Sequence, residues 1–260
     1  MPFTFAHPAA VLPLRRLKSL RLAALMVGSV TPDLPYYVPA KYSRAMIESH
    51  TLMGALWLDI PLGLVTLLMG FLLRRPLTVL MSPRSRALCL HSMERFKEQP
   101  RQWLWAPLAI YIGTWTHIAW DAFTHDSGWV VRRVAALSAP ITIGSYTGTL
   151  CHVLQYVSSA AGLLILAIWY LRLRAAASLD PPNTFLLNGS ARVGILLLVL
   201  TIGTAIGGFI SLRAAYDGAT NYRVIYLLLT RSIAWSGLLY LGAGLLVLLI
   251  RRKPEPLAEI

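Results

Sequence analysis

Residues 113–129 read GTWTHIAWDAFTHDSGW, a stretch that combines an apolar composition with a regular set of ionisable side chains. His117, Asp121 and His125 follow one another at intervals of four residues. On a helix with 3.6 residues per turn, this spacing places all three on one face. Ionisable groups are costly within a membrane and usually serve a function there. The stretch therefore predicts a helix whose ionisable face is functional.

The composition of the whole chain indicates an integral membrane protein. Of the 260 residues, 56% are hydrophobic and 13% are charged, and the mean hydropathy is +0.59. A soluble domain carries about a quarter charged residues. Several apolar runs also approach the roughly 20 residues that a helix needs to cross a bilayer. We expect an all-α, polytopic helical membrane protein without a cleavable signal peptide.

About five transmembrane helices are expected, each bounded by Arg, Lys or turn residues. The predicted spans are 50–73, 103–125, 149–171, 193–212 and 224–250. Residues 9–30 are predicted to form a partly amphipathic N-terminal helix, and residues 74–102 a basic, polar loop. We expect one membrane domain over residues 1–250 and a solvated C-terminal tail over residues 251–260.

The net charge of +13 and the two cysteines exclude some classes of function. The basic residues flank apolar runs as RRLKSLR, RR and RRK, which is typical of membrane anchors that attract anionic lipid headgroups. No nucleic-acid partner is expected. Cys89 and Cys151 are too few for a disulfide framework or a thiolate metal site, so we expect both to be small apolar residues.

If the five spans alternate in direction, the ionisable candidates meet at one membrane face. These candidates are His7, Asp33, His50, His117, Asp121, His125 and His152. Only His91 falls in the opposite loop. Histidines with purely structural roles would not be expected to sort in this way.

Each motif also has a plainer explanation. His117 and Asp121 would lie about 6 Å apart on one helix face, where they could reach one metal ion or form a hydrogen bond between helices. Pro32 and Pro35 hold Asp33 in a stiff turn, where its carboxylate could bind a ligand or simply cap the next segment. His50 follows Ser49, the predicted N-cap of the first span.

Taken together, these residues form a ligand set of imidazoles and carboxylates without a thiolate. Such a set suits a divalent metal, zinc first and manganese or iron as alternatives, and its size suits one or two ions. Metal ions that share carboxylates are common in enzymes that cleave phosphoesters.

Four motifs resemble a bacterial membrane family of unknown function. They are MPFTFAHPAAVLPL, GSVTPDLPYY, SHTLMGALWLDIPLG and GTWTHIAWDAFTHDSGW. That family in turn resembles membrane-bound metal-dependent hydrolases. The order P-D, then H, then H-x-x-x-D is similar to that of the zinc-dependent phospholipase C and P1 nuclease superfamily. The resemblance covers most of the chain and implies a location in the bacterial cytoplasmic (inner) membrane.

The resemblance also implies roles for individual residues. One metal would be held by Asp33, His50, His117 and Asp121. Asp121 would bridge to a second metal with His7, while His125 and His152 would belong to a further site. Asp33 would be the catalytic residue that orients or deprotonates the attacking water. The superfamily completes its further site with H-x-x-x-E, and this chain departs from that pattern because Gln155 and Tyr156 follow His152.

The predicted function is therefore that of a membrane-embedded, metal-dependent hydrolase of a membrane lipid or lipid-linked phosphoester. Arg213, between the last two spans, could contact the substrate phosphate or serve as a boundary anchor. One alternative is a proton- or ion-coupled transporter, which Arg231 inside the last span favours. Another is a non-catalytic membrane protein with a structural metal.

Overall fold

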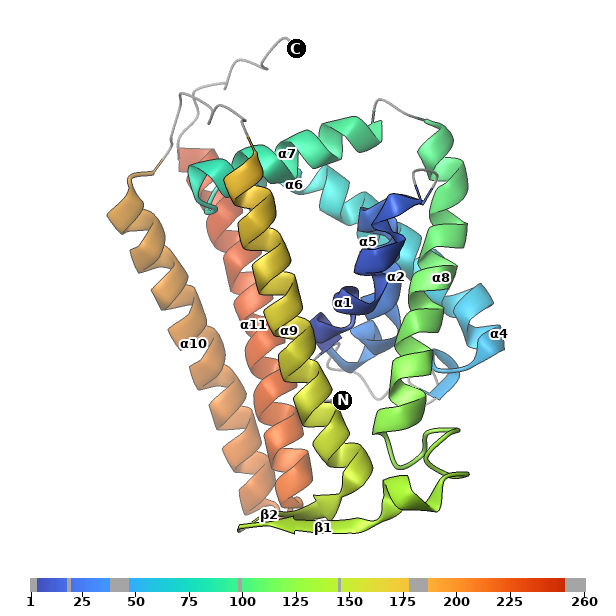
Figure 1. The fold of residues 1–260 in the computed structure, drawn as a ribbon. Helices are drawn as coiled ribbons and strands as arrows, with labels where there is room; N and C mark the ends of the chain where they lie inside the picture. The colour runs from blue at the N-terminus through green and yellow to red at the C-terminus, as the bar shows by residue number, and fades with distance from the viewer. Residues whose placement is uncertain are drawn as a thin grey trace. The chain divides into compact units, whose positions relative to one another are not determined.

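The computed structural model describes residues 4–17, 20–37, 47–97, 100–144, 146–177 and 187–250. Nearly all of them are helical (Figure 1), as the sequence predicts. The predicted tail, residues 251–260, lies outside the described residues. The chain groups into two compact units, Met1–Leu68 with Gln99–Leu173 and Met69–Glu98 with Arg174–Ile260, where the sequence predicted one domain.

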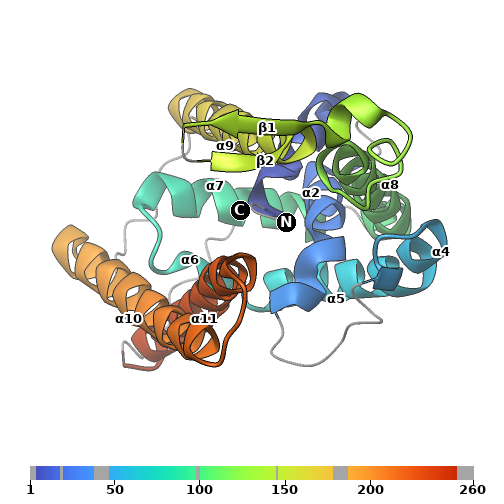
Figure 2. The same ribbon diagram turned by 90° about the horizontal axis from the view of Figure 1, so that it is seen from below.

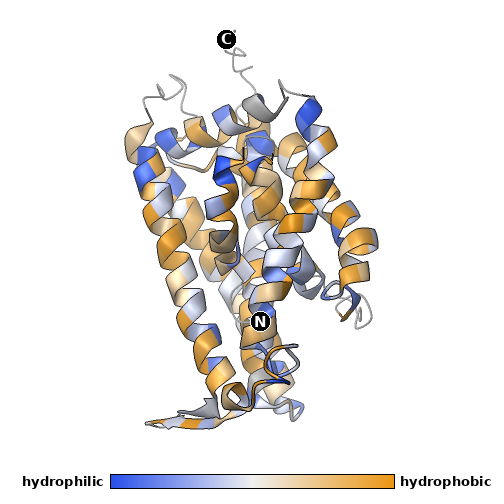
Figure 3. Cartoon of the chain, turned by 45° about the vertical axis from the view of Figure 1, so that its right-hand side comes forward, coloured by the Kyte–Doolittle hydropathy of each residue, from blue (hydrophilic) through white to orange (hydrophobic). Residues whose placement is uncertain are grey.

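Four helices among the described residues are long and apolar enough to cross a membrane. They are Leu52–Leu72, Leu150–Ala176, Gly189–Tyr216 and Arg223–Ile250. On Gly189–Tyr216 (α10), large apolar side chains such as Leu197, Phe209 and Leu212 are exposed, and Figure 3 shows how hydrophobic residues run along the long helices. Apolar surface on this scale suits lipid and not water. The chain is an integral membrane protein.

The region predicted as the span 103–125 forms helix α8, Arg101–Thr124, but α8 is not among these four helices. Polar residues such as Gln102, His117 and Asp121 interrupt its apolar sequence. The described residues therefore support four spans where about five were predicted.

The N-terminal segment is a series of short helices instead of the single amphipathic helix predicted over residues 9–30. Its elements are η1 (Thr4–Ala6), α1 (Pro8–Val11), η2 (Leu12–Arg16), α2 (Leu22–Val30) and η3 (Thr31–Tyr37). The chain is extended at Leu17 and Arg21, which separates η2 from α2. Helix α2 buries Ala24, Leu25 and Gly28, because it packs inside the first unit against α8. Residues 9–30 thus form several short helices packed against the bundle, and the prediction of one continuous helix was wrong.

Two glycines bring α2 and α8 into backbone contact. Gly28 lies directly against the backbone of Ile110, and Gly113 lies against the carbonyl oxygen of Leu25. A Cβ atom at either glycine would overlap backbone atoms of the other helix. Beside them, the Thr114 hydroxyl donates a hydrogen bond of 3.2 Å to the Gly28 carbonyl oxygen. Small residues at this crossing thus fix α8 relative to the end of α2.

The first span consists of α4 (Leu52–Gly54), a π-helical turn η4 (Ala55–Asp59) and α5 (Ile60–Leu72). Its N-cap is Thr51, which accepts a hydrogen bond from the backbone N–H of Gly54 at 3.0 Å, and not the predicted Ser49. The wide turn directly precedes Pro61, which has no N–H to donate to the preceding turn. Packing of η4 against α8 and η3 places Asp59 inside the first unit.

A short antiparallel hairpin leads into the next span of the first unit. Strands β1 (Pro140–Ile143) and β2 (Tyr146–Thr149) follow the helix η5 (Ala135–Ser138) and run beside the start of α9, Leu150–Ala176 (Figure 2). Gly144 in the turn has a φ of 59°, which favours glycine. The Trp120 indole N–H donates to the Ser158 hydroxyl at 3.0 Å and so ties α8 to α9.

The second unit contains four helices among the described residues. They are α6 (Arg74–Thr78), α7 (Pro83–Lys97), α10 (Gly189–Tyr216) and α11 (Asn221–Ile250). Most of the predicted loop 74–102 is thus helical, and that prediction was wrong. Helices α10 and α11 form an antiparallel pair in which Gly203 and Gly207 lie against Ser236 and Ser232.

Candidate metal centre

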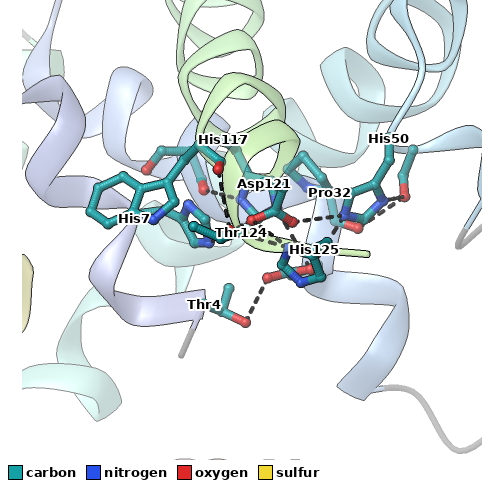
Figure 4. A network of polar contacts seen from close by, with 12 residues as sticks. Thr4, His7, Pro32, His50, His117, Asp121, Thr124 and His125 are labelled. Atoms are coloured by element: carbon teal, nitrogen blue, oxygen red, sulfur yellow. Dashed lines mark hydrogen bonds and ion pairs between the residues drawn. The ribbon is translucent and has the colours of Figure 1, made fainter. Parts of the chain in front are cut away.

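Six of the seven predicted ligands come together in the first unit (Figure 4). They are His7, Asp33, His50, His117, Asp121 and His125, which we call the buried cluster. They come from four stretches of chain, namely the start of α1, η3, the segment before α4, and α8 with the residue that follows it. The side chains of Asp33 and His117 are no more than 1% exposed, whereas those of His50 and His125 are about a quarter exposed. The cluster is thus closed at its base and open to one side.

Two imidazole nitrogens and two carboxylate oxygens of this cluster lie close together. The Nε2 atom of His50 is 3.5 Å from Oδ1 of Asp33 and 3.8 Å from Oδ2 of Asp121. The Nε2 atom of His117 is 3.7 Å and 3.3 Å from the same two oxygens. Zinc binds nitrogen and oxygen ligands at 2.0–2.2 Å in a tetrahedron, whose ligand atoms are then about 3.3–3.5 Å apart. The four distances are close to those between ligands of one tetrahedral ion. Ligand atoms of His50, His117 and Asp121 all lie within 4.8 Å of one another, as do those of His7, Asp33 and His117.

The second oxygen of Asp121 faces two further imidazoles. Its Oδ1 atom is 3.6 Å from Nε2 of His7 and 3.5 Å from Nδ1 of His125. The His7 and His117 rings are stacked with their centroids 3.8 Å apart, so His7 reaches Asp121 from beside the first group of ligands. A carboxylate with one oxygen toward each group can bridge two ions. The structure places His125 in this second group, where the resemblance had paired it with His152.

The end of α2 orients His117. The Nδ1 atom of His117 is 2.8 Å from the carbonyl oxygen of Ser29, one of the last carbonyls of that helix. These carbonyls have no partner within the helix. Since a carbonyl oxygen can only accept, Nδ1 donates and the neutral ring keeps its lone pair on Nε2, which faces the two carboxylates.

Ser49 orients His50 in the same way. The Ser49 hydroxyl donates to the carbonyl oxygen of Pro32 at 2.9 Å, and its oxygen lies 3.0 Å from Nδ1 of His50. Because the hydroxyl proton is committed to the carbonyl, Nδ1 of His50 donates to Ser49. The lone pair of a neutral His50 ring is then on Nε2, toward the buried cluster.

A chain of hydroxyl groups holds Asp33. Its Oδ2 atom accepts a hydrogen bond of 2.8 Å from the Thr4 hydroxyl, which in turn accepts one of 2.9 Å from the Tyr37 hydroxyl. Oδ2 of Asp33 is thus engaged by Thr4. Only Oδ1 of Asp33, which faces His50 and His117, lacks a hydrogen-bond partner among the described residues.

The charge states favour a cation. Burial, reinforced by the nearby His117, lowers the pKa of His7 to about 3, so this ring is neutral at pH 7. Burial by itself raises the pKa of Asp33, but the nearby His117 and His50 outweigh it and bring the pKa below its usual range. Burial by itself lowers the pKa of His117, but Asp33 and Asp121 outweigh it and raise the pKa to about 9, so without an ion this ring is protonated and supplies positive charge between the two carboxylates. A divalent ion would take over that role and displace the proton from Nε2.

Two predicted residues lie outside the buried cluster. The Nε2 atom of His152 is 3.0 Å from Oδ2 of Asp126, so His152 joins a different group. Arg213, in the last turn of α10, belongs to the second unit, whereas the cluster is built entirely by the first.

The sequence analysis did not include Asp59 in the site. Asp59 is fully buried on the π-helical turn, and neither of its carboxylate oxygens has a hydrogen-bond partner among the described residues. It lies within electrostatic range of His50, His117 and Asp33. An acidic residue inside a predicted span was the available signal, and π-helical turns are frequent at functional sites.

The comparisons with known proteins identify a family. Neither the curated proteins nor the solved structures contain a match to the chain. A family model described as a domain of unknown function (DUF4184) matches residues 1–250, which include the whole buried cluster. The chain therefore belongs to the DUF4184 family.

Proposed function

We propose that this protein is a membrane-embedded, metal-dependent hydrolase of the bacterial cytoplasmic membrane that cleaves a phosphoester in a membrane lipid or a lipid-linked substrate. One observation carries the proposal. Donor atoms of Asp33, His50, His117 and Asp121 converge at separations that suit a tetrahedral ion, and the second oxygen of Asp121 faces His7 and His125. The similarity in motif order to the zinc-dependent phospholipase C and P1 nuclease superfamily supports the reaction class by analogy.

The ligand chemistry selects the metal. The buried cluster offers nitrogen and oxygen donors without a thiolate, which suits zinc, or manganese or iron in its place. A divalent ion held there would supply an activated water and a positive charge for the phosphoryl oxygen.

The protein's own residues have separate tasks in this proposal. Ser29 and Ser49 fix the Nδ1 atoms of His117 and His50, so that both Nε2 atoms stay directed at the ligand position. Thr4 donates to Oδ2 of Asp33 and so keeps Oδ1 directed at the ligand position, beside which an attacking water would be held. The more exposed His50 and His125 mark the open side, where a substrate would enter.

The loop after α8 supports a substrate with an anionic headgroup. The N–H groups of Val130 and Val131 donate to the Ala122 carbonyl oxygen, which folds this loop back onto the turn of α8 that follows Asp121. The exposed Arg133 stacks its guanidinium on the Trp129 ring at 4.1 Å. Paired arginine and tryptophan side chains are typical of membrane interfaces, where arginine attracts lipid phosphates.

Elemental analysis of detergent-purified protein tests the proposal, with Asp121→Ala beside His91→Ala as its matched control. His91 is an exposed residue on α7, in the second unit. We expect near-stoichiometric zinc, manganese or iron in the wild type and in His91→Ala, and its loss in Asp121→Ala. The loaded wild type should then hydrolyse bis(p-nitrophenyl) phosphate or a phospholipid, and Asp121→Ala should not.

Two results would count against the proposal. If the wild-type protein stays metal-free after supplementation with zinc, manganese and iron, the hydrolase proposal is wrong. The ion-coupled transporter is then the favoured function. Bound metal without turnover of any phosphoester would favour a structural metal.

A further inference from the structure

A second group of side chains that could hold a metal ion lies between the loop after α8 and the start of α9. It consists of Asp126, Cys151 and His152, which we call the peripheral cluster. The Nε2 atom of His152 is 3.0 Å from Oδ2 of Asp126, and the Cys151 thiol donates to Oδ1 of Asp126 at 3.3 Å. One ligand atom from each of the three residues lies within 4.8 Å of the other two.

Two separate segments bring the peripheral cluster together. The turn after α8, closed by a 2.7 Å hydrogen bond from Gly128 N–H to the His125 carbonyl, presents Asp126. Strand β2 delivers Cys151 and His152 in the first turn of α9, and the Leu150 N–H donates to the Ala139 carbonyl at 3.0 Å. The Thr149 hydroxyl, 3.4 Å from Oδ1 of Asp126 and 3.1 Å from Sγ of Cys151, links the two segments.

Its chemistry differs from that of the buried cluster. The peripheral cluster offers a thiol beside an imidazole and a carboxylate, whereas the buried cluster has only nitrogen and oxygen donors. Cys151 is fully buried, but the side chains of His152 and Asp126 are 34% and 64% exposed. A divalent ion could therefore enter from solution and reach the sulfur from the open side.

We propose that Asp126, Cys151 and His152 form a second, solvent-accessible site for a divalent cation of borderline softness, with zinc as the best match. Sulfur, nitrogen and oxygen donors in one set suit zinc, and three protein ligands leave one tetrahedral position for water. On binding, the S–H bond of Cys151 breaks, its proton leaves to solvent, and the sulfur donates its electron pair to the ion. The site is independent of the proposed hydrolase function.

Cobalt(II) distinguishes this site from the buried cluster, because thiolate coordination adds a ligand-to-metal charge-transfer band in the near ultraviolet. The purified protein in detergent is titrated with Co²⁺, and its absorption spectrum is recorded. We expect the band in the wild type and its loss in Cys151→Ser. Cys89→Ser, which alters the other cysteine, should keep it. Asp121→Ala should also keep it, even where the buried cluster no longer holds metal.

His152→Ala provides a second test at a partly exposed position, in case Cys151→Ser does not fold. We expect at least a tenfold weaker Co²⁺ titration of the band in His152→Ala, and displacement of Co²⁺ by added Zn²⁺ in the wild type. Absence of the band in cobalt-treated wild type, or its persistence in Cys151→Ser or at full affinity in His152→Ala, would overturn the proposal.

Discussion

In each unit, glycines allow two helices to pack closely, but only the pair in the first unit carries the buried cluster. In the first unit, Gly28 and Gly113 let α2 and α8 touch at the backbone. In the second, Gly203 and Gly207 let α10 approach Ser236 and Ser232 of α11. Both pairs follow the general preference for small residues where membrane helices cross.

The pairs differ in where their polar side chains bond. In the second unit, the Ser211 and Thr230 hydroxyls donate to carbonyl oxygens of their own helices, those of Gly208 and Tyr226. In the first unit, His117 bonds to Ser29 across the helix crossing, and its other nitrogen faces carboxylates. A polar group that forms its hydrogen bonds within its own helix has no lone pair directed at a ligand. Polar groups that come together from several elements and keep free lone pairs can form a binding site.

The largest expected effect comes from breaking the crossing of α2 and α8. A valine at Gly28 would overlap the Ile110 backbone, so Gly28→Val should lower the free energy of unfolding by more than the roughly 1–3 kcal/mol of ordinary overpacking. It should also displace Ser29 from His117 and abolish metal binding. Gly207→Val, the matched change in the second unit, should lower stability but leave the metal content of the folded fraction unchanged. Thermal unfolding and elemental analysis of the monodisperse fraction measure both. Full metal content in Gly28→Val would contradict the link between this crossing and the site.

A smaller effect is expected from removing the unpaired carboxyl group of Asp59. A buried polar group without a hydrogen bond costs about 1–3 kcal/mol, so Asp59→Leu should raise the unfolding midpoint of the metal-free protein. The same change removes a carboxyl group within electrostatic range of His50, His117 and Asp33 and should weaken metal affinity by about 10–100-fold, as for outer residues of metal sites.

If Asp59→Leu raises the stability of the metal-free protein but weakens its metal affinity, Asp59 serves metal binding and not the fold. Asp217→Asn, an exposed position after α10, is the control and should change neither quantity. A metal-free Asp59→Leu protein less stable than the wild type would show that the carboxyl group has a stabilising partner.

The smallest of the three effects is expected from removing a single hydroxyl group, that of Thr4 in the first unit or of Thr230 in the second. Thr4→Val removes the hydrogen bond to Asp33, and we expect about a tenfold loss of metal affinity, at the low end for outer residues of metal sites. Thr230→Val removes a hydroxyl that bonds within α11, so its metal affinity should equal that of the wild type. Competition with a fluorescent zinc chelator measures both variants. Equal affinities for both would mean that Thr4 does not hold Asp33 for binding.

Sequence periodicity predicted the long helices because it is a local property. The four spans follow from runs of apolar residues, and the stripe on α8 follows from the four-residue spacing of its ionisable groups. The same reasoning failed for residues 9–30 and 74–102. Pattern alone does not show that extended backbone at Leu17 and Arg21 interrupts the helix, and a basic, polar composition does not exclude a helix such as α7.

The candidate site could be anticipated in its residue types but not in its detailed grouping. His125 and His152 both looked like ligands of one further site, yet they face Asp121 and Asp126 respectively. Cys151, expected to be a small apolar residue, lies with Asp126 and His152. These pairings depend on how the turn after α8 and the hairpin before α9 fold, which no spacing in the sequence encodes.

Composition and the helical period predicted a helical membrane protein with a stripe of imidazoles and a carboxylate on one helix, because both act over a few residues. Only the tertiary structure decided which nitrogen of His117 and His50 faces the carboxylates, which oxygen of Asp33 is engaged, and that Asp59 lies buried beside them. Ser29 and His117 are 88 residues apart in the chain, and a glycine contact between two helices is what brings them within a hydrogen bond.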